Sequence, residues 1–289
     1  RVPIRQVLED AEALNRRLGH ESLGFLSSTH GFLPLEPPRL ALSPSHRAWD
    51  EVAAALPEMF RTLTLRRQVA AMPLLSATAD ALPEADLYRA AAILGILAHA
   101  YHYVEATPYD QTPATILRPW AELSPRLHRP APHLSFIDLN LYNWRLIDPQ
   151  ATDPLRIENL RLLIPIVGNE DERRFQCTPI EMVARFTPVL GAMVRAQEAV
   201  ARDDPDALEA ELLVIGAALN TLTHDSLNKV NPNPHAPLSI DPVVWGKTVA
   251  PLATLKTAKT HARTTTSSPP ATRARSRTTG RRATARGAS

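Results

Sequence analysis

Two histidines stand three residues apart in an apolar segment of the chain. His99 and His102 belong to LAHAYHYVE, residues 97–105. On a helix this spacing turns both imidazoles toward one side, where they could bind one metal ion or contact a macrocycle. Amphipathic His and Tyr side chains are also common where a core helix reaches water or a backbone carbonyl. The residue types favour this second interpretation.

A further histidine follows a long apolar stripe. His224 lies in NTLTHDSLNKVNP, residues 220–232, about 140° around a helix from Leu219. It therefore faces away from the apolar side. It could ligate a haem iron or cap a helix end, and the surface or capping role is favoured.

The single cysteine has a polar neighbourhood. Cys177 follows the charged run at residues 169–174 and precedes Thr178 and Pro179, where the spacing predicts a helix start. The positive end of a helix dipole there would lower the pKa of the thiol. Nucleophilic chemistry would also need a nearby base, which the sequence does not identify. A packing role is therefore favoured.

Most other catalytic constellations are missing from the sequence. It contains no glycine-rich phosphate loop, no HExxH and no GxSxG, and only 10 glycines. Nucleotide chemistry is therefore disfavoured. One cysteine excludes a disulfide framework and a thiolate metal cage, so a cytoplasmic protein is the default expectation.

No membrane span is expected. The longest apolar stretch, Ala90–Ala98, is far shorter than the roughly 20 residues that cross a bilayer. Residues 1–12 carry charges throughout and lack the apolar region of a secretory signal. Because residue 1 is arginine, we expect that an N-terminal piece is missing.

Charge is distributed unevenly along the chain. Asp241 is the last acidic residue; residues 1–241 hold 22 basic and 30 acidic residues, and the remainder holds 10 basic ones. Residues 256–289 contain no large apolar residue, so they are predicted to be a disordered basic tail beyond an ordered end near Leu255. Arginine-rich arms can bind nucleic acid, but this tail lacks aromatic residues for base stacking. Its amino-acid composition resembles that produced by translating a GC-rich gene out of frame. This favours the interpretation that the tail is an unfolded extension without a selected role.

Helical periodicity dominates the remainder. Apolar residues recur at three- and four-residue steps over residues 48–65 and 81–104, and the second segment is apolar enough for a core helix. Six prolines in residues 107–132 predict a wrapping segment with one short helix. A further helix is predicted over residues 179–202, with a kink at Pro188. The body is therefore predicted to be all-α.

The last predicted helix has the clearest start signal. Asp204 is a good N-cap, Pro205 suits the first helical position, and the Asn231-Pro232 pair ends the pattern. An apolar stripe is expected to contact a partner helix; it comprises Leu208, Leu212, Ile215, Leu219 and Leu222.

Residues 118–149 carry a more specific pattern, RPWAELSPRLHRPAPHLSFIDLNLYNWRLIDP. This block resembles the indoleamine 2,3-dioxygenase-like haem proteins, and the NW-x-x-x-DP ending is its most specific part. Within this group it most resembles the bacterial branch that contains monodechloroaminopyrrolnitrin synthase. Similar segments flank the block and extend the resemblance over about residues 30–250; they are HGFLP (30–34), ALPEMF (55–60), LYRAAAILGILAHAYHY (87–103), IEMVARF (180–186) and VNPNP (230–234).

The resemblance implies an all-helical fold with haem b between two domains. Residues 1–154 would form the small N-terminal helical domain over the haem. Residues 155–255 would form part of the larger helical domain, here incomplete.

The resemblance also implies roles for individual residues. Phe136, Leu139 and Asn140 would line the substrate pocket, and Cys177 or Thr178 would provide the small polar group above the iron. Lys247, beside Trp245, loosely matches the cation that pairs with the substrate carboxylate. An indole amino acid suits such a pocket, because it needs an apolar slot and a buried cation or backbone donors.

The chain departs from the family beyond the VNPNP turn. In relatives the proximal histidine, which ligates the haem iron, lies about a hundred residues beyond this turn. This chain has only the basic tail there. His261 is too early for that role and His224 is misplaced, so the axial ligand stays unassigned. We expect that a frameshift near residues 251–256 has replaced the last helices.

Three functions remain open at this point. The first is haem-dependent oxidation of tryptophan or a related indole amino acid with dioxygen, impaired here by loss of the proximal helix. The second is a non-catalytic remnant or interaction protein that exposes the apolar stripe of residues 205–229. The third, nucleic-acid binding through the tail, is least favoured. The oligomeric state is not predicted.

Overall fold

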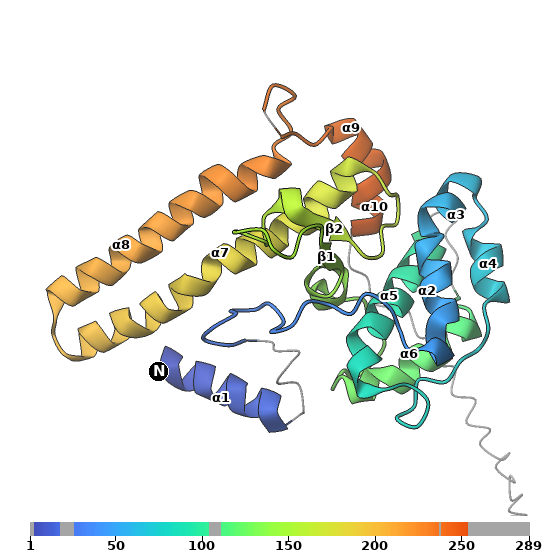
Figure 1. Ribbon diagram of the computed structural model, residues 1–289, viewed down its shortest axis with the longest axis horizontal. Helices are drawn as coiled ribbons and strands as arrows, with labels where there is room; N and C mark the ends of the chain where they lie inside the picture. Colours follow the sequence, from blue (N-terminus) through green and yellow to red (C-terminus); the bar gives the residue numbers. More distant parts are fainter. Residues whose placement is uncertain (1–2, 18–25, 104–110, 237, 254–289) are drawn as a thin grey trace, which may run out of the picture. The chain divides into compact units, whose positions relative to one another are not determined.

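Figure 1 shows the computed structural model, which describes residues 3–17, 26–103, 111–236 and 238–253. Over these residues the chain is predominantly helical, which confirms the all-α prediction. The one sheet in this part of the chain has two short antiparallel strands, β1 (Trp144–Leu146) and β2 (Leu160–Leu162). No helix in the described ranges is long and apolar enough to cross a membrane.

Helix α5 (Leu87–Tyr103) is the centre of the core. Each of its residues from Leu87 to Tyr101 is buried, as expected for a helix that is apolar all round. Helices α2 (Arg47–Ala54), α4 (Leu65–Ala71) and α6 (Ala114–Arg126) pack around it, together with the π-helical turn η3 (Ile137–Leu141). The core helix predicted over residues 81–104 is confirmed, although it begins after the 3₁₀ turn η2 (Glu84–Asp86).

The single helix predicted over residues 48–65 is wrong. The segment forms α2, then α3 (Leu56–Thr62), then the start of α4, preceded by the 3₁₀ turn η1 (Pro44–His46). Pro57 stands in the first turn of α3, where its missing N–H is tolerated, and Leu63 ends α3 with a left-handed backbone (φ 52°). The predicted apolar spacing nevertheless points inward, because Trp49, Leu56 and Met59 are buried.

Two further predictions about prolines need correction. Helix α6 has 13 residues and passes through Pro119 and Pro125, so the proline-rich segment is more regular than expected. Helix α7 (Glu170–Ala201) begins nine residues before Pro179 and contains Pro179 and Pro188 in its interior.

A capping arrangement explains the early start of α7. Asn169 Oδ1 accepts the N–H of Glu172 at 2.8 Å, and the Glu172 carboxylate accepts the N–H groups of the three residues before Asn169. This reciprocal pattern satisfies backbone donors that would otherwise lack partners at a helix start.

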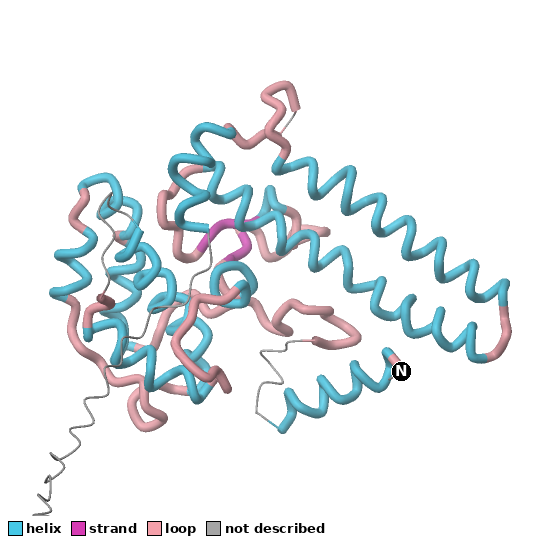
Figure 2. Tube along the Cα trace, turned by 180° about the vertical axis from the view of Figure 1, so that it is seen from behind, coloured by secondary structure: helices cyan, strands magenta, loops and turns pink. Residues whose placement is uncertain are grey.

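Helices α7 and α8 (Pro205–Thr221) run side by side as a hairpin in both views (Figures 1 and 2). The predicted N-cap is confirmed, because Asp204 Oδ1 accepts the N–H of Ala207 at 3.0 Å. Of the predicted stripe, Leu222 is buried and Leu208 and Ile215 are half-buried, whereas Leu212 and Leu219 are exposed. The π turn η5 (Leu222–Ser226) and the 3₁₀ turn η6 (Leu227–Val230) continue the helix as far as Asn231, where the end was predicted.

Short elements complete the described chain. Helix α1 (Ile4–Arg17) contacts α7, where the Ile4 N–H donates to Gln197 Oε1 at 2.7 Å. The 3₁₀ turn η4 (Ile157–Asn159) precedes β2. The chain then ends in α9 (Pro242–Val244), η7 (Trp245–Val249) and α10 (Ala250–Ala253). The predicted disordered tail and His261 lie outside the described residues.

Two helical glycines provide a matched test of this packing. A Cβ at Gly95 in α5 would lie 2.9 Å from Leu134 Cδ1 and 3.4 Å from Trp120 Cζ2, whereas a Cβ at Gly216 in α8 would meet nothing within 4 Å. Alanine at Gly216 should raise the free energy of unfolding by about 1 kcal/mol, the usual difference in helix propensity. Alanine at Gly95 should lower it by about 1 kcal/mol, because overpacking of the core outweighs that gain. Urea denaturation of both variants checks the opposite signs; equal stabilisation would contradict the packing around α5.

Candidate functional site

The NW-x-x-x-DP block forms a structural corner. Asn143 Oδ1 accepts the N–H of Ile164 at 2.8 Å, and the Trp144 Nε1–H donates to the Leu141 carbonyl at 2.9 Å. At the other end of the block the Asp148 N–H donates to Asn159 Oδ1. These bonds connect η3 to the β1–β2 hairpin and fix the segment that carries the predicted pocket residues.

Residues 136–140 divide between surface and core. The Phe136 side chain is 43% exposed, whereas Leu139 lies in the same buried cluster as Cys177. Asn140 is buried and clamped to α7, because its Nδ2 donates to both the carbonyl and the Oε1 of Gln176 at 2.9 Å. The structure therefore brings Leu139 and Asn140 toward α7, and Phe136 does not share their burial.

Cys177 is fully buried in the second turn of α7. Burial raises the pKa of its thiol to about 12, and the charges of Arg173 and Arg161 only partly offset this. The predicted lowering of the pKa by the helix dipole is wrong, because the helix begins seven residues earlier, at Glu170, and the dipole effect fades after the first turn. Cys177 is therefore a neutral thiol at physiological pH.

Thr178 is buried beside it, and its hydroxyl has no hydrogen-bond partner among the described residues. A buried hydroxyl of this kind costs free energy unless a ligand or water satisfies it. Valine at this position should leave the free energy of unfolding unchanged or raise it by about 1 kcal/mol, because no protein hydrogen bond is lost. Thermal denaturation tests this, and a clear loss of stability would show that the hydroxyl has a partner within the protein.

Trp245 contacts the same turn of α7 from the C-terminal segment. Its ring lies 5.3 Å from the ring of Phe175, measured between centroids. Lys247 follows in η7 and is exposed. Residues 175–178 of α7, which we call the α7 turn, thus include Cys177 and Thr178. Asn140 contacts this turn at Gln176, and Trp245 contacts it at Phe175.

The histidines singled out by spacing show no shared metal site. His102 Nε2 is 2.9 Å from Thr112 Oγ1, and the ring of His99 lies 4.9 Å from that of Tyr103. His224 is exposed, as its position off the apolar stripe suggested. Within the described ranges no three His, Cys, Asp or Glu side chains form a group that could hold a metal ion.

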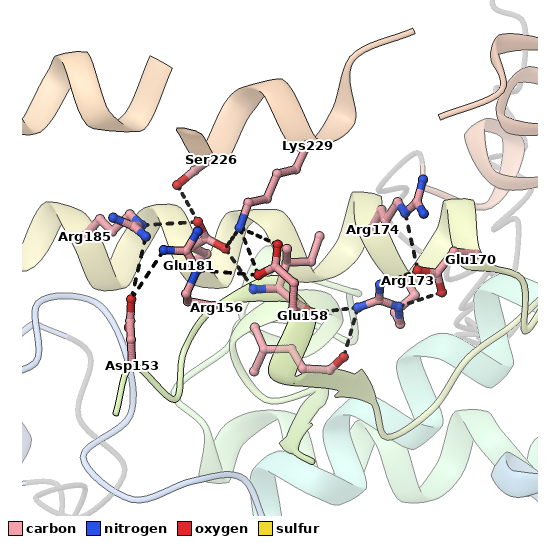
Figure 3. Close-up of polar contacts among 12 residues, drawn as sticks. Asp153, Arg156, Glu158, Glu170, Arg173, Arg174, Glu181, Arg185, Ser226 and Lys229 are labelled. Atoms are coloured by element: carbon pink, nitrogen blue, oxygen red, sulfur yellow. Dashed lines mark hydrogen bonds and ion pairs between the residues drawn. The ribbon is translucent and has the colours of Figure 1, made fainter. Parts of the chain in front are cut away.

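Six charged side chains of alternating sign form a closed ring on the adjoining part of α7 (Figure 3). Successive members of this charge ring, the last contacting the first, are Asp153, Arg156, Glu158, Lys229, Glu181 and Arg185. Lys229 is 6% exposed and Glu181 is 1% exposed, and their Nζ and Oε2 atoms are 2.8 Å apart. Glu181 also accepts the Ser226 hydroxyl and the Ile157 N–H, both at 2.8 Å.

No sequence pattern predicts this ring. The spacing of Glu181 and Arg185 predicts a helical ion pair, but Lys229 comes 48 residues after Glu181, and no local pattern joins them.

The charge ring makes stability sensitive to acid. Burial acts to raise the pKa of Glu181, but hydrogen bonds from Lys229, the Ile157 N–H and Ser226, together with the charge of Lys229, hold it below its ordinary value of 4.5. Stability from this ionisation is therefore fully present above pH 4.5 and is lost as the pH falls through the lowered pKa. The difference in unfolding free energy between wild type and Glu181→Gln should therefore stay constant down to about pH 4.5 and shrink as the pH falls further. A difference that grows over this range would reverse the assigned sign.

The amino-acid sequence is similar to those of known proteins. A family model described as indoleamine 2,3-dioxygenase matches residues 25–236. Indoleamine 2,3-dioxygenase 2 of Mus musculus is 30% identical over 199 residues, which cover 68% of this chain and 48% of that protein.

Proteins of two further organisms are also similar to this chain. Indoleamine 2,3-dioxygenase of Saccharomyces cerevisiae is 31% identical over 156 residues, covering 52% of this chain and 34% of that protein. The 6-hydroxytryptophan 2,3-dioxygenase fscD of Fusarium equiseti is 25% identical over 199 residues, covering 68% of this chain and 48% of that protein. The chain spans about half the length, or less, of these curated relatives. The match to most of its residues shows that the chain belongs to the indoleamine 2,3-dioxygenase family.

Proposed function

We propose that this chain forms the substrate side of a haem pocket in which tryptophan or a related indole amino acid is oxidised by dioxygen. Family membership supports the substrate class, since the relatives carry names of dioxygenases that act on indoleamines or 6-hydroxytryptophan. The observation that carries the proposal is the α7 turn, where two consecutive buried residues carry a neutral thiol and a hydroxyl without a hydrogen-bond partner among the described residues.

The residues present fit haem b on this side only. The Thr178 hydroxyl is buried and unsatisfied in the described part of the chain, and Leu139 and Cys177 belong to the buried apolar core. These three side chains would line the oxygen-binding face of the porphyrin. We assign no axial ligand to any described residue. When bound, haem supplies the oxygen chemistry, and the protein supplies binding, orientation and electrostatics.

Each protein group would then have a distinct task. Leu139 and Cys177 would exclude water from the reacting atoms, and the neutral thiol adds no competing charge or nucleophile. The Thr178 hydroxyl would donate a hydrogen bond to dioxygen or to the substrate. Asn140, held by Gln176, would fix the wall opposite. Trp245 would pack near the indole, and Lys247 would pair with its carboxylate. Phe136 is exposed and would cover the mouth of the pocket.

A spectrum tests this proposal. A counterpart restored in frame beyond residue 251 and reconstituted with hemin should show a Soret band that shifts when an indole amino acid is added, and a dioxygen adduct after reduction. The Lys247→Gln variant should need at least ten times more tryptophan for the same shift, because a charge-assisted hydrogen bond contributes about 1.5–3 kcal/mol. A Soret band that does not respond to any indole amino acid would reject the substrate class.

Finer assignments belong to the same proposal. We propose a small haem-covering domain over residues 1–154 and a partial large domain over residues 155–255, in a cytoplasmic protein of the monodechloroaminopyrrolnitrin synthase-like branch. The frameshift proposal has a simple test. A one-base correction near codons 251–256 should open a hydrophobic helical continuation that contains a histidine. A gene without such a continuation would remove it.

An interaction protein is the second candidate, and one observation favours it. Helix α8 has no buried residue, and Leu212 and Leu219, seven residues apart on one face, are 54% and 48% exposed. Exposed leucines at helical spacing favour association with another chain. Hydrogen exchange that shows full protection of residues 208–222 in a monomer would argue against this alternative.

A further inference from the structure

The charge ring has a tight half and a loose half. The contacts of Lys229 with Glu158 and Glu181 are 3.0 and 2.8 Å, and Glu181 lies 3.2 Å from Arg185. The three contacts on the other side measure 3.6, 3.7 and 3.8 Å, beyond hydrogen-bond distance. Figure 3 shows the loose half around Asp153, at the end of the ring away from Lys229.

One carboxylate oxygen accounts for two of the three long contacts. Asp153 Oδ2 lies 3.8 Å from Arg156 Nη1 and 3.7 Å from Arg185 Nη2. The Nη2 atom of Arg185 is buried and has no hydrogen-bond partner in the described chain. Arginine presents a rigid fork of donors that suits a carboxylate in a bidentate arrangement, so these two guanidinium groups have unused donor capacity.

Asp153 holds this position weakly. Its side chain is 59% exposed, and it forms no contact with either arginine short enough to be a hydrogen bond. An exposed pair of this kind contributes little to stability, typically about 0–1 kcal/mol. A better-placed carboxylate could therefore displace Asp153 at small cost.

Space for a ligand lies beside Arg156. A cavity of about 380 Å³ has the cations Arg156 and Lys229 in its wall, together with one carboxylate, Asp225. The rest of its lining is uncharged or apolar, apart from a histidine: His224, Asn228, Asn231, Ala236 and Leu238. Arg185 lies outside this lining, on the far side of Asp153 from Arg156. Its size suits a small organic molecule. Its two cations outnumber its one carboxylate, which favours an anionic ligand, and the amide groups and apolar side chains are typical of small-molecule sites.

We propose that this cavity is a binding site for a small organic carboxylate. The carboxylate would take the place of the Asp153 side chain and bridge Arg156 and Arg185, and the body of the molecule would occupy the cavity. The site is separate from the α7 turn, and the inference does not rest on the proposed haem function. The tight half of the ring holds the site in place through Lys229 and Glu181.

Calorimetric titration of the chain without haem tests the site with benzoate as the probe and benzamide as its uncharged counterpart. Benzoate should bind and benzamide should not. Arg156→Gln should weaken benzoate binding at least ten-fold, whereas Asp153→Asn should strengthen it several-fold because the resident carboxylate is removed. Arg67→Gln, an exposed arginine in α4, is the matched control and should bind as wild type does.

The outcomes separate the alternatives. Binding seen only in Asp153→Asn would still support the site, with Asp153 as its occupant in the free protein. The proposal would be overturned if benzoate bound neither wild type nor Asp153→Asn, or if it bound wild type and Arg156→Gln equally. Loss of benzoate binding in Lys247→Gln would also overturn it, because the probe would then occupy the proposed indole site. Circular dichroism confirms that each variant is folded.

Discussion

Replacing Lys229 by methionine should lower the free energy of unfolding by about 3 kcal/mol, because the buried carboxylate of Glu181 then loses its closest cation. The pair is 2.8 Å apart, and both side chains are almost completely buried. Arg185 still contacts Glu181 at 3.2 Å, which keeps the expected loss at the lower end for a broken buried ion pair. Urea denaturation at pH 7 gives the value.

Two further variants distinguish charge from packing. In Lys229→Met combined with Glu181→Gln, part of the loss should be recovered, because the uncompensated buried carboxylate is removed and glutamine can still accept the Ile157 N–H. Recovery should be incomplete, because Arg185 then keeps only its 3.7 Å contact with Asp153. Lys247→Met, at an exposed lysine, should change stability by less than about 0.5 kcal/mol. A double variant as unstable as the single one would show that Lys229 acts through packing of its stem.

The Cys177 thiol should be almost inert toward thiol reagents in the folded protein. Its pKa is about 12, compared with an ordinary value of 9.0, which lowers the thiolate fraction at pH 8 by about a thousand-fold. Its complete burial slows the reaction further. Because the chain has one cysteine, labelling with a chromogenic disulfide counts this thiol alone.

Unfolding provides the comparison for this measurement. In guanidinium chloride one thiol per chain should react at once. An added exposed cysteine, Ala210→Cys on α8, should react rapidly in the folded protein. Labelling of wild-type Cys177 within minutes under native conditions would contradict both its burial and the assignment of a neutral thiol beside the proposed pocket.

Local signals predicted those parts of the fold that local chemistry decides. Asp204 and Pro205 define the start of α8 because a cap and a fixed φ act within one turn. The start of α7 carried an equally local signal, Asn169 followed three residues later by Glu172. Pro179 is a second, weaker start signal, and a helix that began there would start nine residues too late.

Other features depend on the packed core and leave no local pattern. The break between α3 and α4 depends on a left-handed Leu63, a conformation that sequence spacing does not predict for leucine. The apolar stripe of α8 was correct in type, but which of its leucines face α7 depends on how the two helices pack.

The candidate site was predicted in part and for related reasons. The resemblance selected Asn140, Cys177, Thr178 and Trp245 as site residues, and their roles stay a prediction. Cys177 and Thr178 belong to the α7 turn, and Asn140 and Trp245 contact it. Their partners, Gln176 and Phe175, carried no signal of their own, because the contacts join segments separated by 36 and 70 residues. Long-range pairings of this kind follow from the fold and not from spacing.

Photoaffinity labelling tests the central claim most directly. An azido derivative of tryptophan, irradiated with the hemin-reconstituted protein, should label peptides that contain residues 136–140 or 175–178, and excess tryptophan should suppress the labelling. Labelling confined to α8 or to the cavity beside Arg156, with residues 136–140 and 175–178 unmodified, would show that the indole does not bind at the α7 turn.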